Sequence, residues 1–133
     1  MRLIGNLGLV HKDKGEIEKA MSLYRQQFEL ARRITHRRGE VTALCNLGVA
    51  SMKIEDFQNA LKFYNSALSV SREIGDIRGE AIILINLAQL LALTNDTAQS
   101  VAYAETALKI FEHLGNPNMA QTRAALAVWR EQS

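Results

Sequence analysis

The sequence predicts an all-α protein in which three helical hairpins stack as an α-solenoid and one further helix closes the C-terminal end. Two observations lead to this fold class. A short motif recurs at a fixed interval of 40 residues, and apolar residues recur every three or four positions along the chain. No useful length of sequence alternates with a period of two, so we expect no strands. Pro117 is the single proline in 133 residues, which lets long helices run without interruption.

The repeat is visible at three kinds of position. Its core motif is Asn-Leu followed by a small residue, beginning at Asn6, Asn46 and Asn86. A small residue recurs later in each copy, and an aromatic follows it in the first two copies. These positions are Ala20, Ala60 and Ser100, then Tyr24, Tyr64 and, with the aromatic lost, Ala104. We therefore expect one domain over 1–133, with repeats at about 1–40, 41–80 and 81–120 and a closing helix at 121–133.

Each unit is expected to contain two helices. In the second unit we predict helices over about 39–53 and 56–74, because apolar residues recur there at helical spacing. Asp56 is a good N-cap, and Gly75 supplies a C-terminal stop. The small residue after each motif leucine, Gly48 in the second unit, should let the second helix approach the first closely. A single hairpin cannot bury its apolar face, so stacking is required.

With these motifs the chain resembles the tetratricopeptide repeat family, over essentially its whole length. The 40-residue period is longer than the family's usual 34, and is similar to kinesin light chains, spindle-orientation adaptors and bacterial peptide-sensing regulators. HEAT and armadillo arrays have similar periods, but the Leu-Gly, Ala and Tyr spacing favours the tetratricopeptide repeat. The resemblance implies a right-handed solenoid whose first helices line a concave groove.

The resemblance also implies which residues face that groove. Those expected to contact a peptide are Asn6, Leu9, Asn46, Val49, Met52, Ile82, Ile85, Asn86, Gln89 and Trp129. The closing helix is expected to present Thr122, Ala125, Leu126 and Trp129 to it. The groove turns apolar toward the C-terminus, which suits an amphipathic helix or an extended segment with apolar anchors.

The three motif asparagines are candidates for contacts with a ligand backbone. A carboxamide both donates and accepts hydrogen bonds, so it can pair with peptide amides whatever the ligand's side chains. Alternatively, each asparagine bonds a neighbouring helix and fixes the repeat register. Trp129 also has two alternative roles: it binds a ligand, or it caps the core of the last hairpin.

Positive charge is concentrated in the first third of the chain. Residues 1–40 contain nine Lys and Arg against five Asp and Glu, although the whole chain has a net charge of only +2. The basic run Arg32, Arg33, Arg37 and Arg38 could contact an acidic partner or phosphate, or could be a solvated helix end. Interleaved aromatics for base stacking are missing, which argues against nucleic acid.

Other functional classes lack their signatures. The sequence has no P-loop or dinucleotide motif, and none of its three histidines has a second metal ligand at suitable spacing, so we expect no cofactor, no metal and no enzyme activity. It has no run of 18 apolar residues, no signal peptide and a single cysteine, Cys45, which favour the cytoplasm and no membrane partner.

The sequence therefore predicts a scaffold or adaptor that binds a peptide or a segment of a partner protein in its groove. The alternatives are a structural self-association module, or a fragment of a larger signalling or transcription regulator. Leu3, Ile4, Leu7 and Val10 form an apolar stripe without a preceding hairpin, which predicts a homodimer through the first hairpin.

Overall fold

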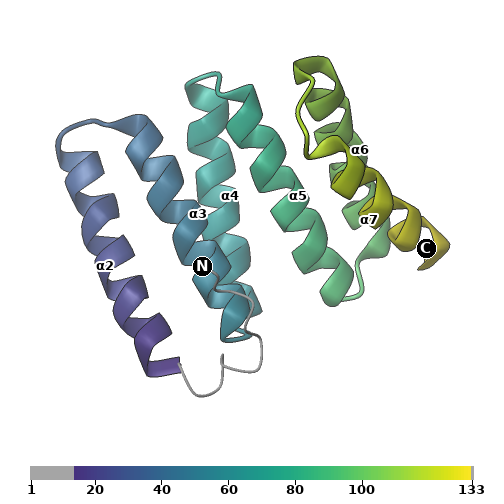
Figure 1. Ribbon diagram of the computed structural model, residues 1–133. Helices are drawn as coiled ribbons and strands as arrows, with labels where there is room; N and C mark the ends of the chain where they lie inside the picture. The colour runs from purple at the N-terminus through teal and green to yellow at the C-terminus, as the bar shows by residue number, and fades with distance from the viewer. Residues whose placement is uncertain (1–13, 133) are drawn as a thin grey trace. The chain divides into compact units, whose positions relative to one another are not determined.

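A computed structural model of the chain describes residues 14–132, and these residues form six α-helices joined by short turns (Figure 1). The described range contains no strand, so the all-α prediction is confirmed. The first helix expected from the repeat falls in residues 1–13, outside the described residues. The helices are α2 (Lys14–Arg33), α3 (Arg37–Lys53), α4 (Phe57–Glu73), α5 (Ile77–Leu93), α6 (Thr97–Leu114) and α7 (Met119–Gln132).

The chain forms two compact units, Met1–Ala67 and Leu68–Ser133, and the boundary between them falls within α4. In the first unit α2 packs against α3, and the two helices run antiparallel (Figure 1). In the second unit α5 packs against α6, and α6 packs against α7. Consecutive helices therefore bury their apolar faces against each other, as the hairpin prediction requires.

Every turn between these helices has the same hydrogen-bonded geometry. One residue in each turn adopts a positive φ of 57–70°, and the next residue donates its N–H to a carbonyl five positions earlier, at 2.7–3.0 Å. This is the Schellman arrangement, which satisfies carbonyls left open at a helix end. The positive-φ residues occur every 20 positions, at Thr35, Glu55, Gly75, Asn95 and Gly115.

The residue that closes one helix also opens the next. The side chain of His36 accepts the backbone N–H of Gly39, and Asp76 and Asp96 cap α5 and α6 in the same way. The predicted N-cap at Asp56 is confirmed, because its Oδ1 accepts the N–H of Asn59 at 3.3 Å. Because the end of one helix and the cap of the next share a turn of three residues, the connections between α2, α3, α4, α5 and α6 are short and conformationally fixed.

The turn geometry predicts opposite effects of exchanging residue types between turns. We expect Gly75→Thr to lower the free energy of unfolding by about 1–2 kcal/mol, because a side chain is unfavourable at its φ of +69°. Thr35→Gly relieves the same strain at φ +57°, so it should stabilise, by less than about 1 kcal/mol because glycine loses more entropy on folding. Urea unfolding measures both changes. Equal effects of the same sign would contradict the strain argument.

Gly48 has the packing role that the sequence suggested. A Cβ built on it would lie 2.5 Å from Cε1 of Tyr64, closer than atoms can approach without rearrangement. The ring of Tyr64, on α4, is 2% exposed. Burial raises the pKa of the Tyr64 hydroxyl, and nearby Cys45 raises it further, so this side chain stays neutral. The missing side chain at Gly48 is thus the space into which an aromatic ring of the next helix packs.

In the third repeat the same contact is made by two small residues. Ala88 and Ala104 occupy the positions of Gly48 and Tyr64, and both are completely buried in one cluster with Leu126. Ser100 replaces the small alanine of the other copies, and its hydroxyl donates to the carbonyl of Ala88 at 2.8 Å. Loss of the aromatic at Ala104 is therefore accompanied by a larger residue at the facing position.

We expect Gly48→Ala to destabilise the protein by about 1–3 kcal/mol, because the added methyl overlaps the Tyr64 ring. Gly15→Ala is the matched control, since nothing lies within 4 Å of the Cβ it would add; its stability should be unchanged or slightly raised. The double variant Gly48→Ala/Tyr64→Ala recreates the Ala88 and Ala104 pair, and should cost less than the sum of its two single substitutions. Additive costs in thermal unfolding would show that the two positions are not coupled.

Two further predictions concern membrane spans and self-association. None of the helices between residues 14 and 132 is long and apolar enough to cross a membrane. The predicted dimer surface of Leu3, Ile4, Leu7 and Val10 lies outside the described residues, and it stays a prediction.

Candidate functional site

The predicted groove positions are the accessible positions of α3 and α5. Along residues 41–50 and 81–90 the pattern of buried, half-buried and exposed side chains is identical, residue by residue. Leu44, Leu47 and their equivalents Leu84 and Leu87 are buried, whereas the intervening face stays open to ligands. That face consists of Thr42, Cys45, Asn46 and Val49 on α3, and of Ile82, Ile85, Asn86 and Gln89 on α5.

On α3 the open face combines one carboxamide with apolar side chains. Asn46 and Met52 are half-buried, and Val49 is 37% exposed. The partly exposed thiol of Cys45 lies on the same face. These residues lie within the first unit. The remaining predicted groove residues of the first repeat, Asn6 and Leu9, lie outside the described residues.

On α5 the open face forms one wall of a hollow of about 280 Å³. The opposite wall comes from α7, and the buried ring of Phe111 on α6 contributes to the lining. This volume accommodates one large side chain or a short stretch of backbone, near the lower end of the range for ligand pockets. The lining residues are Ile82, Ile85, Asn86, Gln89, Phe111, Asn118, Gln121, Thr122, Ala125 and Trp129, and none of them carries a charge.

The carboxamides of Asn46 and Asn86 make no hydrogen bond to another residue in the range 14–132. Buried side-chain nitrogens and oxygens in this range all have partners, so the unpartnered groups are those that water or a ligand can reach. The alternative in which these asparagines bond a neighbouring helix to fix the register receives no support from the described contacts. Four carboxamides line the hollow, each able to donate and to accept: Asn86, Gln89, Asn118 and Gln121.

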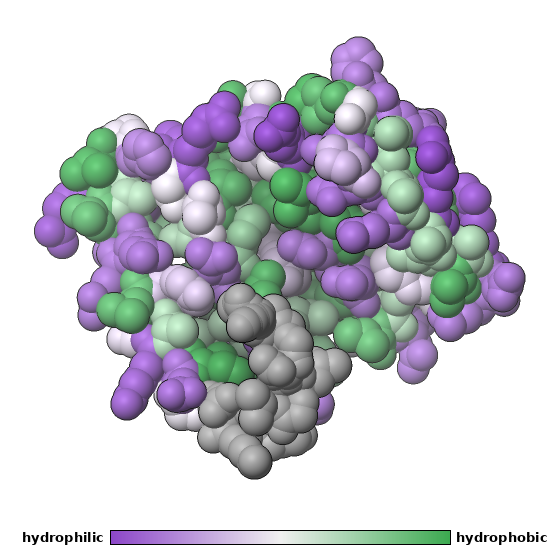
Figure 2. All heavy atoms as spheres, in the orientation of Figure 1, coloured by the Kyte–Doolittle hydropathy of each residue, from purple (hydrophilic) through white to green (hydrophobic). Residues whose placement is uncertain are grey.

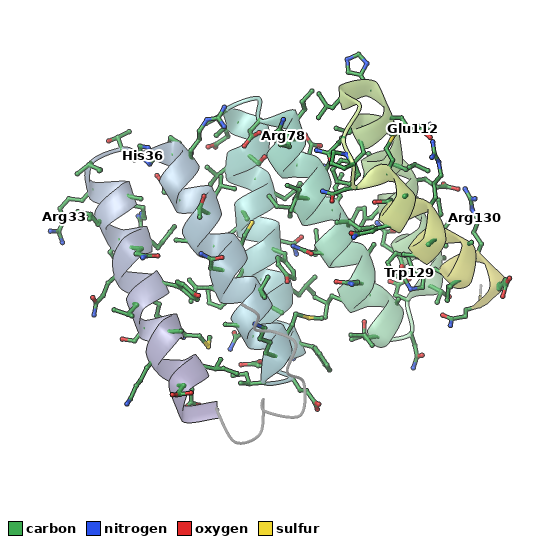
Figure 3. The ribbon with its side chains drawn as sticks, viewed as in Figure 1. Arg33, His36, Arg78, Glu112, Trp129 and Arg130 are labelled. Carbon is green, nitrogen blue, oxygen red and sulfur yellow. The ribbon has the colours of Figure 1, made fainter. Side chains whose placement is uncertain are left out.

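Trp129 has two kinds of contact. Its half-buried ring packs against the cluster of Ala88, Ala104 and Leu126, and it also lines the hollow. Figure 3 shows it on α7. The two sequence interpretations, core cap and ligand contact, are therefore compatible, and substituting this residue will affect packing as well as any ligand.

The closing helix differs from the sequence prediction in which residues face the hollow. Leu126 is 1% exposed and belongs to the core, so its assignment to the groove was wrong. Thr122, Ala125 and Trp129 line the hollow as expected, and Asn118 and Gln121 line it in addition. The reason is the turn after Gly115, where Asn116 Oδ1 accepts the N–H of Asn118 and α7 begins only at Met119. The 40-residue period would start that helix at residue 117, so extrapolating it misassigned Leu126 and missed Asn118 and Gln121.

The basic run does not form one uniform patch. Nη1 of Arg37 donates to both carboxylate oxygens of Glu40, at 3.0 and 3.2 Å, and the Glu40 side chain is only 5% exposed. The guanidinium of Arg32 lies over the ring of Phe28, 5.6 Å from its centroid. Arg33 is exposed and points away from the helices (Figure 3). Arg37 therefore has a structural role, which the sequence did not reveal.

We expect Arg37→Ala to lower the free energy of unfolding by about 1–3 kcal/mol, because it leaves the buried Glu40 carboxylate without this partner. Arg33→Ala is the matched control, and it should change stability by less than about 0.5 kcal/mol because Arg33 is exposed. Adding Glu40→Gln to the Arg37→Ala variant should recover part of the loss by removing the buried charge. Chemical denaturation of the four proteins measures these differences; equal effects at Arg33 and Arg37 would contradict the structural role.

Comparison with known proteins identifies the family. The model of the tetratricopeptide repeat family matches residues 1–73 and again residues 41–113. The chain belongs to the tetratricopeptide repeat family. Proteins of this family are non-catalytic scaffolds whose repeats mediate protein–protein interaction. The resemblance inferred from the repeat motifs is thereby confirmed.

A solved structure supports the fold. The chain is similar to BtubC (BKLC) from P. vanneervenii, with a TM-score of 0.71 and 24% sequence identity. The similarity covers 87% of this chain and 50% of that protein, so the chain spans about half the length of BtubC. None of the curated proteins searched matches the chain. Among the described residues, no group of three or more His, Cys, Asp or Glu side chains could bind a metal ion.

Proposed function

We propose that this tetratricopeptide repeat chain is a non-catalytic adaptor that binds segments of another protein at two open faces, that of α3 in the first unit and that of α5 and α7 in the second. One observation carries the proposal. The carboxamide of Asn86 lies in an uncharged hollow with Ile82, Ile85 and Trp129 and has no partner in the described chain. A carboxamide without a protein partner can hydrogen-bond a backbone amide of a ligand, while the apolar walls beside it contact an apolar side chain of the same ligand.

The same reasoning extends to α3. Asn46 occupies the position of Asn86 with the same degree of exposure, and Val49 and Met52 offer apolar contact beside it. Each asparagine can donate to one ligand carbonyl and accept from one ligand N–H, as neighbouring strands do. Because the hollow contains no charge, the affinity of a neutral ligand segment should depend little on salt.

Several finer points belong to the same proposal. We propose that residues 1–133 act as one binding domain and that the protein works in the cytoplasm. The first-repeat groove residues Asn6 and Leu9 would extend the same face. Self-association through the first hairpin is a separate prediction, and light scattering of Leu3→Lys/Val10→Lys against the parent chain tests it.

The proposal predicts that the two asparagines matter for binding and little for stability. Peptides selected from a random displayed library on the full chain serve as ligands. Asn46→Ala and Asn86→Ala should each weaken their binding about 5- to 100-fold, because removing the partner leaves ligand backbone groups unpaired. Both variants should melt close to the parent, because neither carboxamide has a partner in the described chain.

Asn65→Ala is the matched control, because Asn65 is an exposed asparagine on α4 away from this face. Trp129 is the only tryptophan, so its emission reports a ligand in the hollow directly. Binding that shifts the Trp129 emission and is lost in Asn86→Ala supports the proposal. Binding that is unaffected by both groove variants, or a large loss of stability in them, overturns it.

A further inference from the structure

Both walls of the hollow in the second unit have a pair of carboxamides. On α5 the pair is Asn86 and Gln89, and on the opposite wall it is Asn118, directly before α7, and Gln121 within that helix. The members of each pair are three residues apart, so they are neighbours on the helix surface. None of the four side chains hydrogen-bonds another residue in the range 14–132.

The Asn118 carboxamide is available although its position in the chain usually occupies such a group. An asparagine directly before a helix commonly caps the helix by accepting the N–H three positions later. The corresponding residues before α3, α4, α5 and α6 do so, whereas no described residue bonds the Asn118 side chain. Asn118 lines the hollow instead.

Backbone hydrogen bonds hold Asn118 in place. Its N–H donates to Oδ1 of Asn116 at 2.8 Å. Its carbonyl accepts the N–H of Thr122 at 3.0 Å and the Thr122 hydroxyl at 2.8 Å, and Thr122 is 2% exposed. Because both backbone groups are occupied, Asn118 can offer a ligand only its carboxamide, from a backbone that is fixed.

The hollow does not suit a charged side chain. Charged residues of α5 and α7 that are close in sequence to the lining residues form ion pairs at 2.9–3.0 Å: Arg72–Glu80, Arg123–Glu112 and Arg130–Glu105. Arg78 at the start of α5 and Glu131 at the end of α7 are exposed and do not line the hollow. A charged ligand group there would lose water without gaining an opposite charge, which is costly.

A purely apolar side chain does not suit the hollow either, because it would cover the four carboxamides and leave them without partners. The surface over α5 and α7 mixes hydrophilic and hydrophobic residues and has no continuous hydrophobic area (Figure 2). A ligand amide satisfies a carboxamide both as donor and as acceptor. The methylene groups of a glutamine side chain can also contact Ile85 and Trp129, which line the same hollow.

We infer that the hollow recognises a glutamine side chain of the bound segment. Asn118 and Gln121 hydrogen-bond the carboxamide of that glutamine, while Asn86 bonds the ligand backbone beside it. The inference rests on the proposed function, since the ligand is a segment of another protein, and it adds a residue preference at one position of that segment.

Peptides selected from a random displayed library on the full chain provide the test. Those that shift the Trp129 emission and lose binding in Asn86→Ala should share a glutamine at one position. Synthetic versions of one such peptide then have glutamine, glutamate or methionine there, three side chains of similar size that differ in charge and hydrogen bonding. By fluorescence anisotropy, the glutamine peptide should bind at least about tenfold more tightly than the glutamate peptide and about fivefold more tightly than the methionine peptide.

Asn118→Leu/Gln121→Met should make the methionine peptide bind more tightly than the glutamine peptide, because apolar side chains of similar size replace both carboxamides. Its melting temperature should stay close to that of the parent, since neither carboxamide has a partner in the described chain. Gln121→Met alone changes an exposed residue and should narrow the preference even if the double variant proves unstable. Gln99→Met is the matched control, at an exposed glutamine of α6 that does not line the hollow, and should keep the parent's preference.

The outcomes separate this inference from the proposed function. Peptides that bind through Asn86 but share no glutamine, or that bind equally with all three side chains, overturn the inference and leave the proposed function in place. A glutamate peptide that binds more tightly, as attraction to Arg78 would produce, also overturns it. If no selected peptide depends on Asn46 or Asn86, the proposed function is itself contradicted, and the inference with it.

Discussion

The backbone turn that recurs every 20 residues is the constraint on which the rest of this structure depends. Each turn combines a left-handed residue with a bond from the next N–H to a carbonyl five positions earlier, and in the four turns before α3, α4, α5 and α6 that next residue also caps the following helix with its side chain. Because the turns are alike, α3 and α5 begin at the same point of their repeats and bury the same positions. Asn46 and Asn86 are therefore equally accessible, because helices that bury the same positions also expose the same positions.

The close contact between the two helices of a repeat is the second constraint, and it tolerates more than one solution. An aromatic ring needs the absence of a side chain opposite, as at Tyr64 and Gly48, whereas Ala104 is compatible with Ala88. The contact therefore does not require one particular pair: a tyrosine ring needs a glycine opposite, whereas two alanines with a much smaller combined volume pack against each other. The composition of a repeat can thus change at this contact while both of its helices are kept.

Periodicity explains both what the sequence could predict and what it could not. The helix bounds in the second repeat, the cap at Asp56 and the stop at Gly75 were predictable because those residue types favour these geometries. The left-handed conformations of Thr35 and Glu55 were not, because such residues avoid positive φ and adopt it here only through their place in the repeat. Asn118 and Gln121 were missed because the turn at Asn116 departs from the period, and the pairing of Arg37 with Glu40 was missed because Glu40 gives no sign of burial in the sequence.

The 20-residue turn spacing also has a consequence for how this chain can change over time. Inserting or deleting one residue inside α5 would rotate everything beyond it by about 100° around the helix axis. Such a change would turn Gln89 away from the hollow and bring buried leucines to the surface. Point substitutions on the open faces, by contrast, leave the backbone untouched. A lineage of such proteins can therefore acquire new binding preferences by exchanging side chains, while its length is free to change mainly in whole helical units.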